Sequence, residues 1–216
     1  MITGVEAGET EVKVKVENEA GSIEVTVPVI VVGADPLSQT VPGSTVLLNE
    51  TFVGATSQNF WEATYKSIPG TSLPMYYPTG NQSKITFIDG QMTIDGARFA
   101  IGQTDSKPTE GSDTIVYGSF DFSKNWKVQI HIITTSGSSS KKFQVQVDNN
   151  TETGSNSIHG SKSRIFNKPI SDLNNNTTIT LSSAEHGQFT PNSFLFLRTE
   201  SNATVVIDQI LVETWE

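Results

Sequence analysis

Residues 126–148, WKVQIHIITTSGSSSKKFQVQVD, constrain the fold more than any other stretch of this chain. Apolar and polar residues alternate strictly on both sides of a Gly/Ser-rich tip. Such a period of two is the pattern of a β-strand with one dry side and one wet side. We therefore predict two antiparallel strands joined as a hairpin, whose inward residues are Trp126, Val128, Ile130, Ile132, Phe143, Val145 and Val147.

The polar residues of the same stretch predict a wet face that could bind a polar ligand. Four of them carry amide or imidazole groups: Gln129, His131, Gln144 and Gln146. The simpler interpretation of His131 is a solvated histidine on a strand. We keep this face as a second choice of binding site.

The remainder of the chain predicts an all-β protein. Thr, Ser, Asn and Gly are abundant, and no segment has a helical apolar period over three turns. We predict an antiparallel β-sandwich of jelly-roll type with an N-terminal β-hairpin extension. Its expected strands are 45–53, 84–88, 91–95, 97–101, 115–122, 126–135, 141–148, 177–182, 193–199 and 203–214, separated by long polar loops at 54–83, 102–114 and 149–176.

The sequence divides into three parts. Residues 10–32 alternate around a turn at 18–22, so residues 1–33 are expected to be the C-terminal part of an immunoglobulin-like spacer domain. Residues 34–44 are small, polar and proline-containing, which indicates a linker. Residues 45–216 then form the sandwich domain.

Charge and composition exclude several classes of function. The net charge is −9, and residues 1–50 hold eight acidic residues and two lysines, a balance of −6. No basic stripe exists to neutralise phosphates, so nucleic acid is not an expected partner. No apolar run is long enough for membrane insertion. The chain has no cysteine, so disulfides and thiolate chemistry are excluded.

Motifs of catalysis are missing from the sequence. There is no GxSxG, no HExxH and no glycine-rich phosphate loop. The histidines at 131, 159 and 186 are far apart in sequence. We therefore expect a protein that is not an enzyme.

Two carboxylates suggest a structural cation. Glu50 opens the first core strand in LNETF, and Asp208 lies in the last strand, TVVIDQILVE. The terminal strands of jelly rolls commonly lie side by side, and Ca²⁺ prefers oxygen ligands. We predict a calcium site at Glu50 and Asp208, against the simpler interpretation that both are exposed strand acids.

The three arginines suggest an acidic ligand. Arg98, Arg164 and Arg198 each follow or begin a strand-like segment, and the planar guanidinium group matches a carboxylate bidentately. The alternative is that each arginine pairs internally, for example with Asp95 or Glu200.

Aromatic residues between prolines add a second kind of sugar contact. Tyr76 and Tyr77 lie between Pro74 and Pro78, where at least one ring is expected to be exposed. Flat rings stack on the apolar faces of sugars. They join the candidate ligand-binding residues.

Six ordered blocks of sequence resemble a known family. The blocks are NETFVGATSQNFW, YKSIPGTSLPMYY, ARFAIGQT, FQVQVDNNT, SIHGSKSRIFN and SFLFLRTESNATVVIDQILVE. Together they span roughly residues 48–214, and they resemble a non-catalytic, carbohydrate-binding-like module of bacterial pectate-lyase-like proteins. Position by position, the resemblance and the polar loop 147–167 give these candidates: Arg98, Asn149, Asn150, His159, Lys162, Arg164 and Arg198.

The resemblance implies a function and a setting. We expect a secreted or cell-surface carbohydrate-binding module, monomeric, whose ligand is a plant cell-wall polysaccharide, with acidic pectin (homogalacturonan) favoured. A covalently linked catalytic domain is expected in the parent protein. The alternatives are a structural or adhesive spacer of a bacterial surface protein and a small polysaccharide lyase.

Overall fold

The computed structural model describes residues 8–18, 21–31, 37, 41–55, 66–67, 74–76, 84–102, 118–148 and 164–216. The chain divides into two compact units, Met1–Pro36 and Leu37–Glu216. Within the described ranges no helix has the length and apolar character that crossing a bilayer requires.

The first unit is a β-hairpin. β1 (Gly8–Asn18) pairs with β2 (Gly21–Val31) in an antiparallel register that places Val12 opposite Val27. The alternation of valines with charged residues is what a two-stranded ribbon requires. The predicted hairpin is confirmed.

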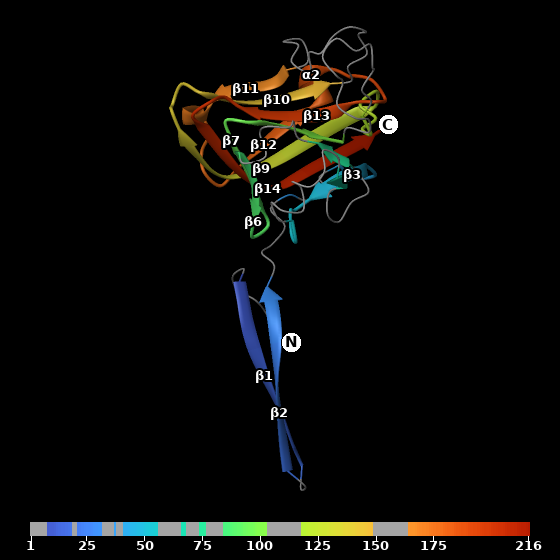
Figure 1. The fold of residues 1–216 in the computed structure, drawn as a ribbon. Coiled ribbons are helices and arrows are strands. Elements are labelled where there is room, and N and C mark those ends of the chain that lie inside the picture. Colours follow the sequence, from blue (N-terminus) through green and yellow to red (C-terminus); the bar gives the residue numbers. More distant parts are fainter. Residues whose placement is uncertain are drawn as a thin grey trace. The chain divides into compact units, whose positions relative to one another are not determined.

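The second unit is a sandwich of two antiparallel sheets, seen as two layers in Figure 1. The first, which we call the β10 sheet, has the order β11-β10-β13-β8-β5-β4. Its strands are Arg164–Pro169, Lys142–Asp148, Phe194–Thr199, Arg98–Ile101, Pro74–Tyr76 and Lys66–Ser67.

The other layer, which we call the β9 sheet, has the order β12-β9-β14-β7-β6, with β3 also paired to β14. Its strands are Thr177–Ser182, Asn125–Gly137, Ala203–Trp215, Gln91–Asp95, Ile85–Ile88 and, for β3, Thr45–Glu50. Two short helices, η3 (Ile170–Asp172) and α2 (Ser183–His186), complete the described elements. The predicted all-β sandwich is confirmed.

The two strands that dominate the sequence do not form the predicted hairpin. β9 pairs with β12 and β14, whereas β10 pairs with β11 and β13. Residues 138–141 therefore carry the chain from one sheet to the other. Alternation specifies which side of a strand is dry, but a strand can meet its apolar partner across the core instead of beside it.

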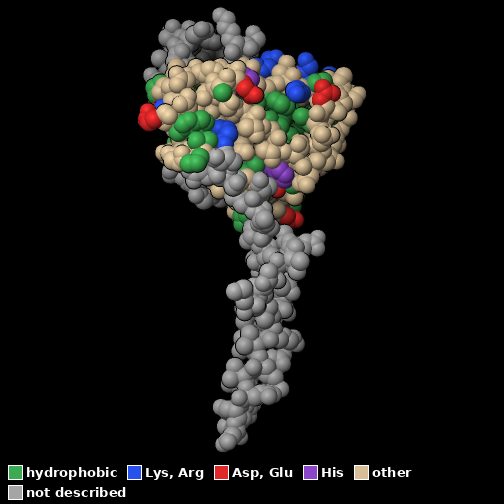
Figure 2. All heavy atoms as spheres, turned by 180° about the vertical axis from the view of Figure 1, so that it is seen from behind, with side chains coloured by type: hydrophobic (Ala, Val, Ile, Leu, Met, Phe, Trp, Pro, Cys, Tyr) green, Lys and Arg blue, Asp and Glu red, His purple; other side chains and the backbone are tan. Residues whose placement is uncertain are grey.

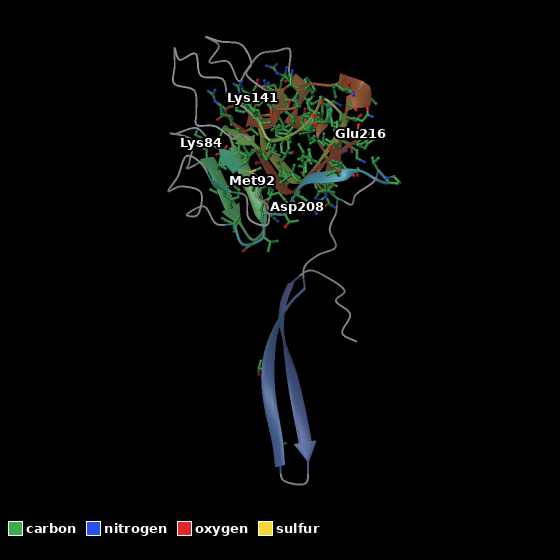
Figure 3. The ribbon with its side chains drawn as sticks, turned by 90° about the vertical axis from the view of Figure 1, so that its right-hand side faces the viewer. Lys84, Met92, Lys141, Asp208 and Glu216 are labelled. Atoms are coloured by element: carbon green, nitrogen blue, oxygen red, sulfur yellow. The ribbon has the colours of Figure 1, made fainter. Side chains whose placement is uncertain are left out.

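The core lies between the dry sides of β9 and β10. Trp126, Val128, Ile130, Phe143 and Val145 are fully buried, and Val147 is 1% exposed. All of them belong to one hydrophobic cluster that both sheets share, and in Figure 3 the side chains fill the space between the layers around Met92. The predicted inward residues are confirmed.

Most predicted strand boundaries are close, but the predicted strand 115–122 is wrong in its described part, where residues 118–122 form no strand and Phe120 makes an isolated bridge with Ser193. β3 ends at Glu50, three residues before the end of the predicted 45–53. β12 occupies the predicted 177–182, and β9 and β14 extend each prediction by a residue or two. The predicted loops 54–83 and 149–176 are wrong in part, because β4 and β5 lie in the first and β11 occupies Arg164–Pro169 in the second. Its sequence RIFNKP has a charged start and a terminal proline, and it forms an edge strand, where proline is tolerated.

We predict that Ile130→Ala lowers the free energy of unfolding by about 2–5 kcal/mol, because it leaves a cavity in a fully buried site. Chemical denaturation measures the change. Thr180→Ala, on the exposed side of the neighbouring strand β12, is the control and should change it by less than about 1 kcal/mol. Equal effects of the two substitutions would contradict the assignment of the core.

Candidate functional site

The outer side of the β10 sheet carries all three arginines, and two of them lie directly opposite each other. In the register of β13 and β8, Arg198 lies directly opposite Arg98. On the other side of β13, Arg198 lies opposite Gln144 of β10, which in turn lies opposite Asn167 of β11. Residues that are directly opposite project to the same side of a sheet. A row of four polar side chains therefore crosses four strands.

A second row lies next to the first. Arg164 is opposite Gln146, which is opposite Phe196, and Phe196 is opposite Ala100. Gln146, Phe196 and Ala100 are almost fully buried but do not belong to the shared core cluster. Arg98 and Arg198 in the first row are half-buried, and Asn167 is exposed. Arg98, Arg198 and Asn167 are therefore the accessible side chains of the first row, whereas Gln144 between them is 3% exposed. We call the surface made by the two rows the arginine face.

The positive charges of Arg98 and Arg198 repel each other. Burial lowers the pKa of Arg98, and the charge of Arg198 lowers it further. Like charges directly opposite each other on neighbouring strands are destabilising. A bound anion would relieve this repulsion.

Asp95 and Glu200, the carboxylates suggested as internal partners of the arginines, each accept another hydrogen bond. The Asp95 carboxylate accepts a hydrogen bond from Thr204 Oγ1 at 3.0 Å. Glu200 Oε2 accepts one from the backbone N–H of Lys142 at 3.2 Å. Among the described residues no ion pair involves Arg164 or Arg198.

Gln144 Oε1 and Arg164 Nε are buried polar atoms on the arginine face that have no hydrogen-bond partner within the described structure. Gln144 is 3% exposed, and its Nε2 donates to Asn167 Oδ1 at 3.1 Å. Buried polar groups without partners are rare in proteins, because the lost contact with water is not replaced.

Lysine adds to the positive charge of this surface. Lys142 precedes Gln144 by two residues on β10, so it projects to the same side and is half-buried. Figure 2 shows Lys and Arg side chains gathered along the upper edge of the sandwich, where Figure 1 places β10 and β11. These lysine and arginine side chains would attract an anionic ligand although the protein as a whole is acidic.

Several predicted site residues lie outside the described residues: Asn149, Asn150, His159, Lys162 and Tyr77. Tyr76 is described in its backbone, which pairs with Ala100. The sequence did not predict that Lys142 and Gln144 belong to the same site as the arginines. Alternation predicted their wet-side positions on β10, but it did not predict the pairing of β10 with β11 and β13.

The second-choice wet face does not exist as one surface. Gln129 and His131 lie on the β9 sheet, and Gln144 and Gln146 lie on the β10 sheet. Since the dry sides of β9 and β10 face each other, their polar sides point in opposite directions. That prediction is wrong because it required the hairpin.

The outer side of the β9 sheet is attached to the segment before β3. Gln209 on β14 accepts from Leu37 N at 2.9 Å and donates to Leu37 O at 3.4 Å. Glu213 accepts from Ser44 Oγ at 2.8 Å and pairs with Lys127 at 3.2 Å. Burial alone would raise the pKa of Glu213, but these bonds outweigh it and lower the pKa. Leu37 and Ser44, which lie in the predicted linker 34–44, thus bind the sandwich.

The predicted metal ligands lie on neighbouring strands but on different sides. Glu50 is opposite Ile210 of β14 and is 1% exposed, on the core side. Asp208 bonds His131 Nδ1 at 2.6 Å on the outer side, near the lower margin of the body in Figure 3. The described residues contain no group of three or more His, Asp or Glu side chains suited to a metal.

Glu50 alone keeps one feature of a cation ligand. Its Oε1 accepts from Phe52 N at 2.6 Å, and its Oε2 is buried without a partner among the described atoms. A calcium site at Glu50 and Asp208 stays a prediction. If a cation binds there, chelation should lower the melting temperature, since a ligand of the folded state stabilises it. An unchanged melting curve in chelator, with no metal by elemental analysis, would remove the prediction.

A pH dependence of stability follows from Glu50. Burial raises its pKa from 4.5 to about 7, although hydrogen bonds from the backbone of Phe52 and Thr51 oppose the rise. The unfolded chain then ionises at lower pH than the folded one. The contribution of Glu50 to stability is therefore complete below about pH 4.5 and is lost as the pH rises through about 7.

We predict that the melting temperature in chelator-containing buffer falls by several degrees between about pH 4.5 and pH 8, relative to Glu50→Gln. The substitution keeps the size of the side chain and removes its titration. Differential scanning calorimetry of both proteins gives the comparison. Parallel curves for the two proteins would show that Glu50 does not titrate in this range.

Comparisons with known proteins do not assign a family. No protein-family model and no curated protein matches the sequence. Among solved structures, the chain is similar to the C-terminal CBM6 of LamC, a marine laminarinase from Zobellia galactanivorans, with a TM-score of 0.29 and 10% identity, over 79% of this chain and 94% of that chain. A TM-score this low establishes neither a common fold nor a common ligand, so the sandwich assignment rests on the strand pairing described above.

Proposed function

We propose that the sandwich unit is a non-catalytic carbohydrate-binding module that holds an acidic polysaccharide on the arginine face. The favoured ligand is a pectic galacturonan, and the setting is a secreted enzyme with a linked catalytic domain. The observation that carries the proposal is the position of Arg98 directly opposite Arg198. Two guanidinium groups at this spacing favour an anion between them.

The neighbours of the arginine pair favour a sugar acid over a simple anion. Gln144 and Asn167 continue the row with amide groups, which bind hydroxyls. With strands about 4.8 Å apart, the row spans about 14 Å, which suits an oligosaccharide better than a single ion. The sequence blocks that resemble the pectate-lyase-associated module point to the same ligand class.

The position of one lysine is compatible with the alternative function of a small polysaccharide lyase. Lys142 lies on the same side of β10 as Gln144, close to the place proposed for the carboxylate. Abstraction of a proton next to a carboxylate requires a base in such a position. An ultraviolet assay for unsaturated products, run alongside the binding measurements, should detect no turnover. Product formation lost in Lys142→Ala would replace the proposal with a lyase.

We predict that Arg198→Ala abolishes measurable binding to de-esterified homogalacturonan. Truncating one partner of a partly desolvated charge pair costs about 2–5 kcal/mol of binding free energy. Arg198→Lys keeps the charge but loses the planar fork, so it should bind with intermediate affinity, and Arg164→Lys and Arg164→Ala should follow the same order. Binding of the wild type should weaken with salt and with methyl-esterification of the pectin. Isothermal titration calorimetry measures each affinity.

The control for these variants is Lys84→Ala, which removes an exposed positive charge beside β6 on the other sheet. It should bind like the wild type. In the absence of ligand, Arg198→Ala should also be more stable than the wild type by about 0.5 kcal/mol, because the repulsion with Arg98 is gone. Equal affinity of wild type and Arg198→Ala would place the site elsewhere.

A further inference from the structure

The row across the arginine face changes its chemistry from one end to the other. Arg98 and Arg198 on β8 and β13 are cationic, whereas Gln144 and Asn167 on β10 and β11 are neutral amides. A polymer that carried only charge would gain little from the amide end. The two halves of the row therefore suit different groups of one ligand.

The amide end is oriented before any ligand binds. Gln144 Nε2 donates to Asn167 Oδ1 at 3.1 Å, which fixes the side chain of Gln144 and directs its Oε1 away from Asn167. Gln144 is 3% exposed, and Oε1 has no hydrogen-bond partner among the described residues. A buried carbonyl oxygen in this state is an acceptor that a ligand hydroxyl could satisfy.

The nearest row supplies the complementary atom. Arg164 lies on β11 opposite Gln146, roughly 7 Å along the sheet from the Gln144 row. Its Nε is a buried donor that also lacks a partner in the described structure. A carboxylate can accept from Arg164 but cannot donate to Gln144. A hydroxyl group both donates and accepts, so sugar hydroxyls can satisfy both atoms.

We propose that Gln144, held by Asn167 and assisted by Arg164, forms a hydroxyl-reading subsite beside the carboxylate-reading pair Arg98 and Arg198. This inference rests on the proposed function and narrows it. The arginine face selects an oligosaccharide with an acidic unit next to a hydroxyl-bearing unit, and it discriminates against free uronic acid and against polyanions without hydroxyls. Gln144 is the residue that determines this specificity.

The test compares Gln144→Leu with Gln129→Leu. Leucine is close to glutamine in size and removes the orphaned acceptor, so Gln144→Leu should keep or raise the melting temperature. Gln129 is a matched control, because it is a strand glutamine with a buried unpaired Oε1 on the β9 sheet. Isothermal titration calorimetry is run with galacturonic acid, trigalacturonate, polyacrylate and xylotriose.

The expected results separate the two halves of the site. Wild type and Gln129→Leu should bind trigalacturonate at least about tenfold more tightly than galacturonic acid or polyacrylate, compared per charge. Gln144→Leu should lose about tenfold toward trigalacturonate and nothing toward galacturonic acid. Asn167→Ala should give a smaller loss, because it frees the Gln144 side chain without removing it.

Other outcomes have distinct meanings. Equal binding of trigalacturonate by wild type and Gln144→Leu would overturn the subsite and leave the arginine proposal intact. Binding of polyacrylate as tight as that of trigalacturonate would also overturn it. Binding of xylotriose alone, lost in Gln144→Leu, would support the subsite and overturn the acidic ligand. No binding of any probe by the wild type would overturn both.

Discussion

Burial of the dry sides of β9 and β10 against each other is the constraint on which the other features depend. Each strand presents apolar residues at every second position, and these residues meet in one cluster between the sheets. The short connection at 138–141 moves the chain across the core between them. As a result, the polar sides of the two strands form opposite outer surfaces, and each surface acquires its neighbours from other parts of the chain.

The two outer surfaces differ in chemistry because the outward side chains of β13 and β14 have different neighbours. On the β9 sheet, Gln209 and Glu213 of β14 bind the protein's own segment at Leu37 and Ser44. On the β10 sheet, Arg198 of β13 lies between Arg98 and Gln144, and Gln144 Oε1 has no hydrogen-bond partner among the described residues. One surface is therefore stabilised by its own chain, and the other retains unsatisfied chemistry that suits a ligand.

The sequence predicted what local alternation can predict. The inward residues of β9 and β10, the all-β class and most strand boundaries follow from period-two patterns. The pairing of strands does not, because Arg98 and Arg198 are opposed through a register between segments distant in sequence. The convergence of the arginines was a hypothesis from their chemistry, while Gln144 joined them only once β10 was placed between β11 and β13. β11 was missed because its charged and proline-ended sequence resembles a loop.

The central claim is that an acidic sugar lies across the arginine face, and a crystal structure with bound trigalacturonate tests it most directly. The account predicts a carboxylate within hydrogen-bonding distance of the guanidinium groups of both Arg98 and Arg198, with hydroxyls of the adjacent sugar toward Gln144 Oε1. Sugar bound on the outer side of the β9 sheet, or on the β10 sheet without contact to either arginine, would contradict it.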